Sequence, residues 1–532
     1  MNTSLSSWPA DMATPIRDWT VGSLLREVAE AVPERVGLVA GVRESSSRRR
    51  WNYGEILTEA EMVARALLGR FQPGERVAVC APNIPQWVLL QYGAALAGMT
   101  LVTLNPAYRP EEMAYVLGQS RSAGIVLVPE YRGTPIAQFL DEVRPQLPEL
   151  REAISFGDWQ ALLASGSPTE KLPAVGPDDI ALILYTSGTT GFPKGAMLRH
   201  RGITNNARFI ARRLGVQDGD IWLNVMPVYN VAGCAISVLG ALSYRTTQVL
   251  ATFDPGLALS LVEAERANVL LGAATMYITL MEHPDFTTRD LSCLQSVFAG
   301  GSVIPVHVVR RLEETLGIPF GIVYGQTEAS GIITQTKPTD SPEDRGETIG
   351  QPLPHAEVKI VDPTTGDIVS PGAIGELCVR GYQVMAGYFE MPEATAQAID
   401  LDGWLHTGDL CSMDERGYCR VEGRLKDMII RGSQNIYPRE IEELLRRHPD
   451  VSDVAVVGIP DEKYGELVAA FVRPAPGCSP TRAELHAFCR EHLAPYKTPR
   501  HWVFVDAFPL TPSGKIQKFL LREGFLREGT PV

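Results

Sequence analysis

A glycine- and hydroxyl-rich segment at residues 185–195, Tyr-Thr-Ser-Gly-Thr-Thr-Gly-Phe-Pro-Lys-Gly, combines side chains that can hold a phosphate group. Its glycines let backbone N–H groups converge without a clash from Cβ atoms, and its hydroxyl groups add further donors. Lys194 supplies a positive charge on a flexible side chain. The segment follows a short apolar run at residues 180–184, which predicts a buried strand. We therefore expect a nucleotide phosphate to bind at the end of this strand.

This segment is not a Walker loop, because Lys194 follows Pro193 and no Ser or Thr comes next. A polar surface turn is the alternative for any short motif of this composition. All eleven residues closely resemble the phosphate loop of the acyl-adenylate-forming superfamily, which includes acyl-CoA synthetases, carrier-protein adenylation domains and beetle luciferases. The resemblance implies ATP contacts from Thr186, Ser187, Gly188, Thr189, Thr190, Gly191 and Lys194.

A second segment, Tyr324-Gly-Gln-Thr-Glu328, follows an apolar run at residues 320–323 that predicts another strand. Ligands of open α/β sheets bind beyond the carboxyl ends of the strands, where this turn is expected. A helix N-cap is the alternative role for a Thr-Glu pair. The segment resembles the next motif of the superfamily, and the resemblance implies that Thr327 contacts the α-phosphate and that Glu328 holds Mg²⁺. A hard carboxylate oxygen suits that cation.

Residues 403–410, Gly-Trp-Leu-His-Thr-Gly-Asp-Leu, place the carboxylate of Asp409 after a predicted turn. A carboxylate can accept hydrogen bonds from both hydroxyl groups of a ribose, and the resemblance assigns this role to Asp409. Turns also commonly contain aspartate without any ligand. Arg424 corresponds to a family residue that reaches the ribose or a phosphate. Lys426 corresponds to the hinge between two domains, although a lysine in isolation would be a solvated surface charge.

The segment Pro509-Leu-Thr-Pro-Ser-Gly-Lys515-Ile-Gln-Lys518 is expected to place Lys515 on an exposed turn. By itself this lysine would be an ordinary surface charge. The segment matches the C-terminal motif of the superfamily, and the resemblance implies that Lys515 bridges the substrate carboxylate and an α-phosphate oxygen. The motifs occur in the family order between residues 185 and 518.

Apolar patterns around these motifs predict alternating strands and helices, which are typical of parallel β-α-β units. Up to residue 323 we expect helices at residues 21–32, 86–97, 110–119, 199–214 and 305–316, and strands at residues 76–80, 100–103, 124–128, 180–184, 269–273, 295–301 and 320–323. After residue 426 we expect helices at residues 437–447 and 482–492 and after Lys515, and strands at residues 454–458, 467–472 and 502–505.

A chain of 532 residues exceeds what one core usually organises, so at least two domains are expected. We predict an α/β fold with a large N-terminal AMP-binding domain of α/β layers, residues 1–425, which carries the ATP site and the acyl pocket. A smaller, mobile α+β domain, residues 426–532, would carry the adenylation lysine.

The reaction that the resemblance implies requires these parts. Attack of a carboxylate on the α-phosphorus of ATP brings two anions together, so catalysis depends on positioning and charge neutralisation. Lys515, Lys194 and Mg²⁺ on Glu328 would supply the charge, and the products would be an acyl-adenylate and pyrophosphate. In the family the C-terminal domain then rotates about the hinge and presents the region of Gly432 as one wall of a tunnel for a thiol. The other implied ATP contacts are Gly301, Tyr324, Gly325 and Val421.

The resemblance places the acyl group beside segments without ionised side chains, at residues 229–233, 272–277 and 298–301 and at Gly325. The implied pocket residues are Asn230, Val231, Gly233, Ala299, Gly300 and Gly325. A second charge on the acid would be buried unpaired, whereas each buried methylene adds about 0.8 kcal/mol of binding. We therefore expect a medium-to-long fatty acid, with an alicyclic or aryl acid as runner-up. Acyl-CoA synthetases of the family often have His where this chain has Asn230, which affects the lining and gate of the pocket.

Coenzyme A is the expected acceptor, because a carrier-protein adenylation domain would continue into a carrier domain and 17 residues follow Lys515. A stand-alone enzyme that charges a separate carrier protein is the alternative. No motif indicates the oxygen chemistry of a luciferase. Lys194, Glu328 and Lys515 argue against a catalytically silent nucleotide-binding protein.

The composition of the chain argues against several other classes of protein. A formal net charge of −13 argues against a nucleic-acid partner. The eight cysteines include no C-x-x-C pair, so neither a zinc site nor a disulfide framework is predicted, and a reducing, cytoplasmic setting fits best. The chain starts without a basic and apolar leader and contains no run of about 18 apolar residues, so no transmembrane segment is expected. The oligomeric state stays open, with a homodimer as one option.

Overall fold

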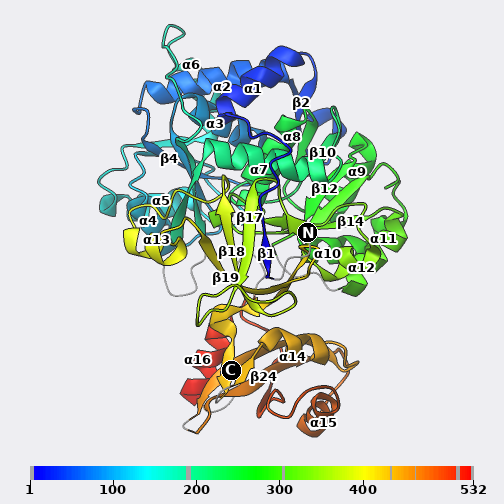
Figure 1. Ribbon diagram of the computed structural model, residues 1–532. Helices are drawn as coiled ribbons and strands as arrows, with labels where there is room; N and C mark the ends of the chain where they lie inside the picture. The colour runs from blue at the N-terminus through cyan, green and yellow to red at the C-terminus, as the bar shows by residue number, and fades with distance from the viewer. Residues whose placement is uncertain are drawn as a thin grey trace.

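The computed structural model describes residues 5–186, 193–301, 306–431, 434–461, 463–510 and 516–528. Several predicted site residues lie outside this part of the chain, namely Ser187, Gly188, Thr189, Thr190, Gly191, Gly432 and Lys515. The described strands form four sheets, three of them before residue 425 and one after it (Figure 1).

The first sheet has six strands in the order β7-β6-β4-β5-β8-β9, and every neighbouring pair is parallel except β8 with β9. Its strands are β4 (Arg76–Cys80), β5 (Thr100–Leu104), β6 (Gly124–Leu127), β7 (Glu152–Ser155), β8 (Ile180–Thr186) and β9 (Lys194–Arg199). Along β4, Val77 and Val79 pack into one core while Ala78 and Cys80 pack into another, as expected for a strand buried on both faces. One face is covered by α1 (Val21–Ala31), α2 (Tyr53–Leu68) and α3 (Pro85–Leu96), and the other by α4 (Pro110–Gln119) and α5 (Ile136–Val143).

The second sheet has nine strands in the order β16-β15-β14-β13-β12-β10-β11-β2-β3. Its strands are β2 (Val36–Ala40), β3 (Arg50–Asn52), β10 (Ile221–Asn224), β11 (Thr247–Leu250), β12 (Val269–Gly272), β13 (Ser296–Ala299), β14 (Phe320–Tyr324), β15 (Thr334–Gln335) and β16 (Gln351–Pro352). The strands from β14 to β2 are parallel. β3 at one edge, and β15 and β16 at the other end, are antiparallel to their neighbours.

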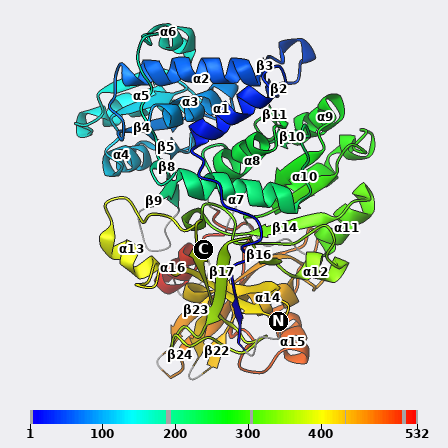
Figure 2. The ribbon, with the colours of Figure 1, turned by 45° about the horizontal axis from the view of Figure 1, so that its top comes forward.

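Helices also cover this second sheet on both faces. One face packs against α9 (Pro255–Glu265), α10 (Ala274–Glu282) and α11 (Val306–Leu316), and the other packs against α7 (His200–Arg213). Figure 2 shows the first sheet on the left, the second sheet with α9, α10 and α11 on the right, and α7 crossing between them.

The third sheet is antiparallel throughout, and its order is β1-β17-β18-β19-β20. Its strands are β1 (Ser7–Trp8), β17 (Ala356–Val361), β18 (Gly375–Gly381), β19 (Leu405–Met413) and β20 (Cys419–Arg424). The pairing of β1 with β17 joins the start of the chain to a strand from its second half. The sequence did not predict this sheet. Asp409 lies inside β19, a strand that begins after a turn at residues 400–403.

The last unit, drawn in orange to red below the rest of the molecule in Figure 1, contains the fourth sheet. Its elements are β21 (Ile429–Arg431), β22 (Gln434–Ile436), α14 (Pro438–Leu445), β23 (Val451–Asp461), β24 (Gly465–Pro474), α15 (Arg482–His492), β25 (His501–Phe504) and α16 (Lys518–Glu528). Apolar clusters fill both faces of the sheet, one with α14 and α15 and the other with α16.

The predicted fold class is confirmed: α/β layers form the larger part of the chain and a smaller α+β unit follows them. The helices predicted at residues 110–119 and 482–492 are confirmed with the same bounds as α4 and α15.

Candidate active site

The hairpin of β8 and β9 brackets the predicted phosphate loop. Thr186, the last residue of β8, is paired with Lys194, the first residue of β9. Antiparallel pairing therefore fixes these two residues at the base of the loop. Two residues that the sequence assigns to ATP are neighbours in space.

The carboxylate of Glu328 lies beside this hairpin. Thr186 Oγ1 donates a hydrogen bond of 3.3 Å to Glu328 Oε1, and the Tyr388 hydroxyl donates one of 2.8 Å to the same oxygen. Lys194 Nζ lies 5.0 Å from the centre of the Tyr388 ring, within cation–π range. Burial and then the charge of Glu328 raise the pKa of the Tyr388 phenol, which keeps it a donor at neutral pH. The predicted metal ligand and two predicted ATP residues thus form one cluster.

Tyr388 was not predicted as a site residue. It follows β18 in a loop and reaches the cluster because it forms an isolated antiparallel bridge with Ala196 of β9. The backbone N–H of Met197 also donates to the carbonyl of Gly387 at 3.0 Å. A Gly-Tyr pair is too common to indicate such a contact, and no spacing rule connects residue 388 with residue 328.

The chain after β14 reverses direction in a 3-10 turn, Thr327–Ala329, whose N-cap is Gln326. A Cβ atom on Gly325 would lie 2.1 Å from the carbonyl oxygen of Gly331, so only glycine fits there. Ser330 closes the turn with φ of 56°, in the left-handed region. This reversal holds Thr327 and Glu328 at the carboxyl end of β14, where the sequence predicted them.

Asp409 forms a second cluster with Tyr324 and Arg424. The Tyr324 hydroxyl donates a hydrogen bond of 2.8 Å to Asp409 Oδ2, and Arg424 Nε lies 3.2 Å from Asp409 Oδ1. Burial and then the charge of Asp409 raise the pKa of Tyr324 well above its usual value. Tyr324 and Glu328 lie on the same segment, so the two clusters belong to one site.

Two predicted acyl-pocket residues, Asn230 and Val231, precede a π-helix, Ala232–Ser237. The carbonyl of Asn230 accepts hydrogen bonds from the N–H groups of Gly233 at 3.0 Å and Cys234 at 3.1 Å. A Cβ atom on Gly233 would lie 2.2 Å from the carbonyl oxygen of Pro227, so this glycine is required by packing.

Two more predicted acyl-pocket residues, Ala299 and Gly300, lie at the end of β13, and Gly325 follows β14. Ala299 is fully buried within the core between β13 and the helices α9 to α11. A Cβ atom on Gly300 would lie 2.6 Å from Val323 Cγ2 of β14. Gly301, predicted for ATP, has φ of 82°, which favours glycine. These residues therefore lie on a different element from Asn230.

The predicted hinge residue, Lys426, lies in a 3-10 turn, Leu425–Asp427, that connects β20 to β21. Across this turn, Arg439 of α14 donates a hydrogen bond to the carbonyl of Val421 in β20. Val421, which the sequence assigns to ATP, thus also joins the third sheet to the C-terminal unit.

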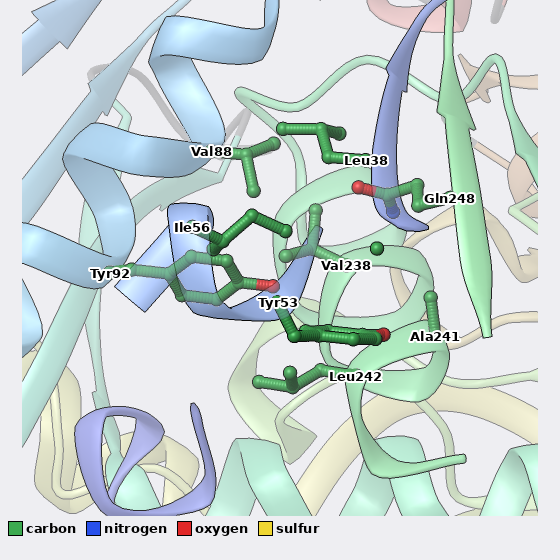
Figure 3. Close-up of a pocket in the computed structure, with 10 residues that line it drawn as sticks. Leu38, Tyr53, Ile56, Val88, Tyr92, Val238, Ala241, Leu242 and Gln248 are labelled. Carbon is green, nitrogen blue, oxygen red and sulfur yellow. The ribbon is translucent and has the colours of Figure 1, made fainter. Parts of the chain in front are cut away.

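A small cavity of about 10 Å³ lies elsewhere in the molecule (Figure 3). Its lining residues are Gly37, Leu38, Tyr53, Ile56, Val88, Tyr92, Val238, Ala241, Leu242 and Gln248. None of them is a predicted site residue. Gln248 Nε2 is buried and lacks a hydrogen-bond partner among the described residues, and the volume is close to that of a single water molecule. The cavity is therefore part of the core, and the chemistry gathers around Glu328 and Asp409.

Comparisons with known proteins agree with this geometry. A family model described as AMP-binding enzyme matches residues 25–389, and one described as AMP-binding enzyme C-terminal domain matches residues 440–515. The chain is 41% identical over 534 residues to YngI of Bacillus subtilis, and the match covers 95% of this chain and 96% of that protein. It is 35% identical over 539 residues to the mitochondrial medium-chain acyl-CoA ligase ACSF2 of Homo sapiens, and the match covers 95% of this chain and 87% of that protein. The crystal structure of ATP-bound MatB from Rhodopseudomonas palustris matches with a TM-score of 0.86 at 28% identity, covering 95% of this chain and 99% of that chain.

The chain therefore belongs to the AMP-binding enzyme family. Within that family it is an acyl-CoA synthetase, an enzyme that binds ATP and uses it to activate an acid for transfer to coenzyme A. Among the residues that the structure describes, no helix has the length and apolar character needed to cross a membrane.

Proposed function

We propose that this synthetase activates a hydrophobic carboxylic acid, with medium-to-long fatty acids preferred, and transfers the acyl group to coenzyme A. An alicyclic or aryl acid is the second candidate. The reaction proceeds in two steps: the carboxylate attacks the α-phosphorus of ATP and expels pyrophosphate, and the thiol then attacks the acyl carbonyl and expels AMP.

The apolar surroundings of β13 and the similarity to the medium-chain acyl-CoA ligase ACSF2 support this proposal. A void of about 20 Å³ behind β13, far smaller than an acyl pocket of several hundred Å³, is lined by Ala258, Leu259, Val262, Leu270, Tyr277, Leu280, Phe286, Leu291, Leu294, Val297, Leu312 and Leu316. Val297 lies on the same face of β13 as Ala299, because side chains alternate along a strand. The one hydroxyl group in this lining, on Tyr277, donates to the carbonyls of Leu270 and Phe298. The side chains behind β13 are therefore apolar, and they would have to move apart to admit a tail, because the void itself is too small for one.

The donor set at Glu328 fits Mg²⁺. Both hydrogen bonds from Thr186 and Tyr388 go to Oε1, and no hydrogen bond to Oε2 occurs among the described residues. Oε2 is therefore available as a hard oxygen ligand. Bound there with the triphosphate, Mg²⁺ would supply charge neutralisation, and Thr186 and Tyr388 would keep the carboxylate oriented.

The protein groups have distinct tasks in this proposal. Lys194 and the loop 187–191 hold the β- and γ-phosphates, Thr327 contacts the α-phosphate, and Asp409 with Arg424 binds the ribose. Lys515 stabilises the negative charge that develops between carboxylate and α-phosphate. Residues 1–425 and 426–532 act as two domains that change orientation about Lys426. This rotation removes Lys515 from the site and brings in the region of Gly432, which forms one wall of the thiol tunnel.

Two further expectations accompany the function. A cytoplasmic location remains a prediction from the sequence, and the oligomeric state stays open, with a homodimer as one option; the ACSF2 relative is named as mitochondrial. Cell fractionation and light scattering of the purified protein test them.

An acid panel tests the substrate class. Pyrophosphate release should be measured with saturated acids of about two to sixteen carbons, because typical ligand pockets of a few hundred Å³ could hold acids within this range. The panel should also include benzoate, cyclohexane carboxylate and an amino acid. Each added methylene should raise kcat/KM by about fourfold until the pocket is filled. Acetate or an amino acid as the best substrate would contradict the proposal.

The acceptor needs its own test, because a carrier protein is the alternative thiol. Acyl-thioester formation should be followed with coenzyme A and with phosphopantetheinylated carrier protein. Rapid thioester formation with coenzyme A supports the proposal, and transfer only to the carrier protein would replace it.

A further inference from the structure

The strand that carries Asp409 is irregular at this residue. The pairing of β18 with β19 shifts between Glu376 and Cys378, and Gly408 has φ of 69°. The bulge turns the backbone just before Asp409, and such bulges commonly re-aim a side chain. The direction of the Asp409 carboxylate therefore depends on whatever holds residues 407 and 408.

Glu376 holds this bulge through its carboxylate. Glu376 Oε1 accepts a hydrogen bond of 2.9 Å from the N–H of Gly408. Thr407 Oγ1 accepts one of 3.1 Å from the N–H of Asp409 and donates one of 2.7 Å to the carbonyl of Leu377. Two consecutive N–H groups of the bulge thus bond to oxygens of side chains. Glu376 is 7% exposed, so its charge is almost removed from water.

His406 balances that buried charge. Its Nδ1 lies 2.8 Å from Glu376 Oε2, and its Nε2 lies 3.8 Å from Asp400 Oδ2. Cys378 and Glu376 raise the pKa of His406 to about 10, so the imidazolium form prevails at neutral pH and donates to the carboxylate. His406 therefore fixes the orientation of Glu376, and Glu376 fixes Gly408.

Glu376, Cys378 and His406 also have the spacing of metal ligands, since their donor atoms lie within 4.8 Å of one another. Both oxygens of Glu376, however, already have a donor within the protein. The cluster is complete as a hydrogen-bonded ion pair.

We propose that Glu376 and His406 are positioning residues for ATP, which act through the Gly408 bulge to aim the Asp409 carboxylate at the ribose. This inference rests on the proposed role of Asp409. Neither residue needs to touch the nucleotide.

The test compares ATP with 2′-deoxy-ATP and 3′-deoxy-ATP in adenylate formation by full-length variants. Glu376→Ala and His406→Gln should raise the KM for ATP by about tenfold or more, the range for a lost hydrogen bond to a charged group, while kcat changes far less. They should also reduce the preference for ATP over the deoxynucleotides. Glu376→Gln should recover part of the affinity for ATP and part of the preference for ATP, because its amide oxygen can still accept a hydrogen bond from the N–H of Gly408. Glu357→Ala, which removes a carboxylate of the same sheet that pairs with Arg380 and has no hydrogen bond or ion pair with Glu376 or His406 among the described residues, is the matched control.

The outcomes separate this inference from the function on which it rests. If wild-type enzyme and Asp409→Asn treat ATP and the deoxynucleotides alike, the ribose role of Asp409 fails, and the inference fails with it. If Asp409→Asn loses the preference but folded Glu376→Ala and His406→Gln variants keep it, the inference alone is overturned. Stoichiometric zinc in the purified protein that is lost in Cys378→Ala would also overturn it, by making the cluster a metal centre.

Discussion

The phenol of Tyr324 donates a 2.8 Å hydrogen bond to the carboxylate of Asp409, and this contact ties the second sheet to the third. Tyr324 ends β14 and Asp409 lies inside β19, so the contact fixes the distance between the segment that carries Glu328 and the proposed ribose ligand.

Tyr324→Phe removes this contact and should raise the KM for ATP by about tenfold or more, because a hydrogen bond to a charged group is lost. Steady-state pyrophosphate release at varied ATP measures the effect. Tyr53→Phe is a matched control, since the Tyr53 hydroxyl also donates a hydrogen bond, to the carbonyl of Thr246, but lies outside the proposed site. An unchanged KM in Tyr324→Phe would show that Asp409 is held by other contacts.

Tyr388→Phe removes the 2.8 Å hydrogen bond to Glu328 Oε1. Adenylate formation should fall by about tenfold or more and should require a higher concentration of Mg²⁺, because the metal-binding carboxylate becomes less well oriented. A titration of Mg²⁺ at saturating ATP measures both effects. Tyr382→Phe, at another partly buried tyrosine whose hydroxyl accepts a hydrogen bond from Asn206, should leave the titration unchanged. A parallel shift in both variants would indicate a general loss of stability.

Lys515→Ala should abolish adenylate formation and spare thioester formation from supplied acyl-AMP. The reason is that the positive charge is needed only where the carboxylate meets the α-phosphate. The two half-reactions should be assayed separately, with Lys518→Ala as the neighbouring control. Equal losses in both half-reactions would contradict the assignment.

Lys426→Pro should retain pyrophosphate release and lose thioester synthesis. Proline fixes φ near −65° and so restricts the rotation that the proposed hinge requires. Arg439→Ala is a useful companion, because it removes the hydrogen bond from α14 to Val421 without changing the hinge backbone. Thioester synthesis that survives in Lys426→Pro would place the hinge elsewhere.

His200 should make stability depend on pH. It is 1% exposed, and burial lowers its pKa from 6.5 to about 4, while its Nδ1 accepts a hydrogen bond from the N–H of Val21. Below pH 6.5 His200 is protonated in the unfolded chain but stays neutral in the folded chain until the pH nears 4. The contribution of neutral His200 to the free energy of unfolding is therefore complete above pH 6.5 and declines towards pH 4. His200→Gln should therefore weaken the loss of stability between pH 7 and pH 4.5 in urea unfolding, pH values chosen to span that window. Identical pH profiles for both proteins would contradict the effect.

Local patterns predicted much of the fold. The runs that became β4, β8 and β14 are short and apolar, and the polar turns after β8 and β14 carry the motifs, so both the elements and the neighbourhood of Glu328 could be anticipated. The third sheet could not, because its strands alternate with long loops and pair across distant parts of the chain. Tyr388 was missed for the same reason: its contact with Glu328 depends on a bridge to β9.

The residues predicted to line the acyl pocket show another limit of prediction from sequence. A pocket lined by small residues such as Ala299 and Gly233 would be expected to offer free space, yet Ala299 is fully buried in the core and Gly233 has no room for a Cβ atom. A small side chain can reflect tight packing as well as an open pocket. A bulky substitution at Ala299 would therefore perturb the core before it could report on chain length.

The pairing of Ser7 with Lys359 has a consequence for how the protein is made. A ribosome that adds 5–20 residues per second needs roughly 20–70 s to travel between these two positions. During that interval β1 has no partner, and the sheet that aims Asp409 cannot close. The helices and strands of the first sheet, around the phosphate loop, leave the ribosome earlier and pair with segments that have already been synthesised. The nucleotide site is therefore finished only after most of the chain has been synthesised, and nascent chains shorter than this should bind ATP poorly.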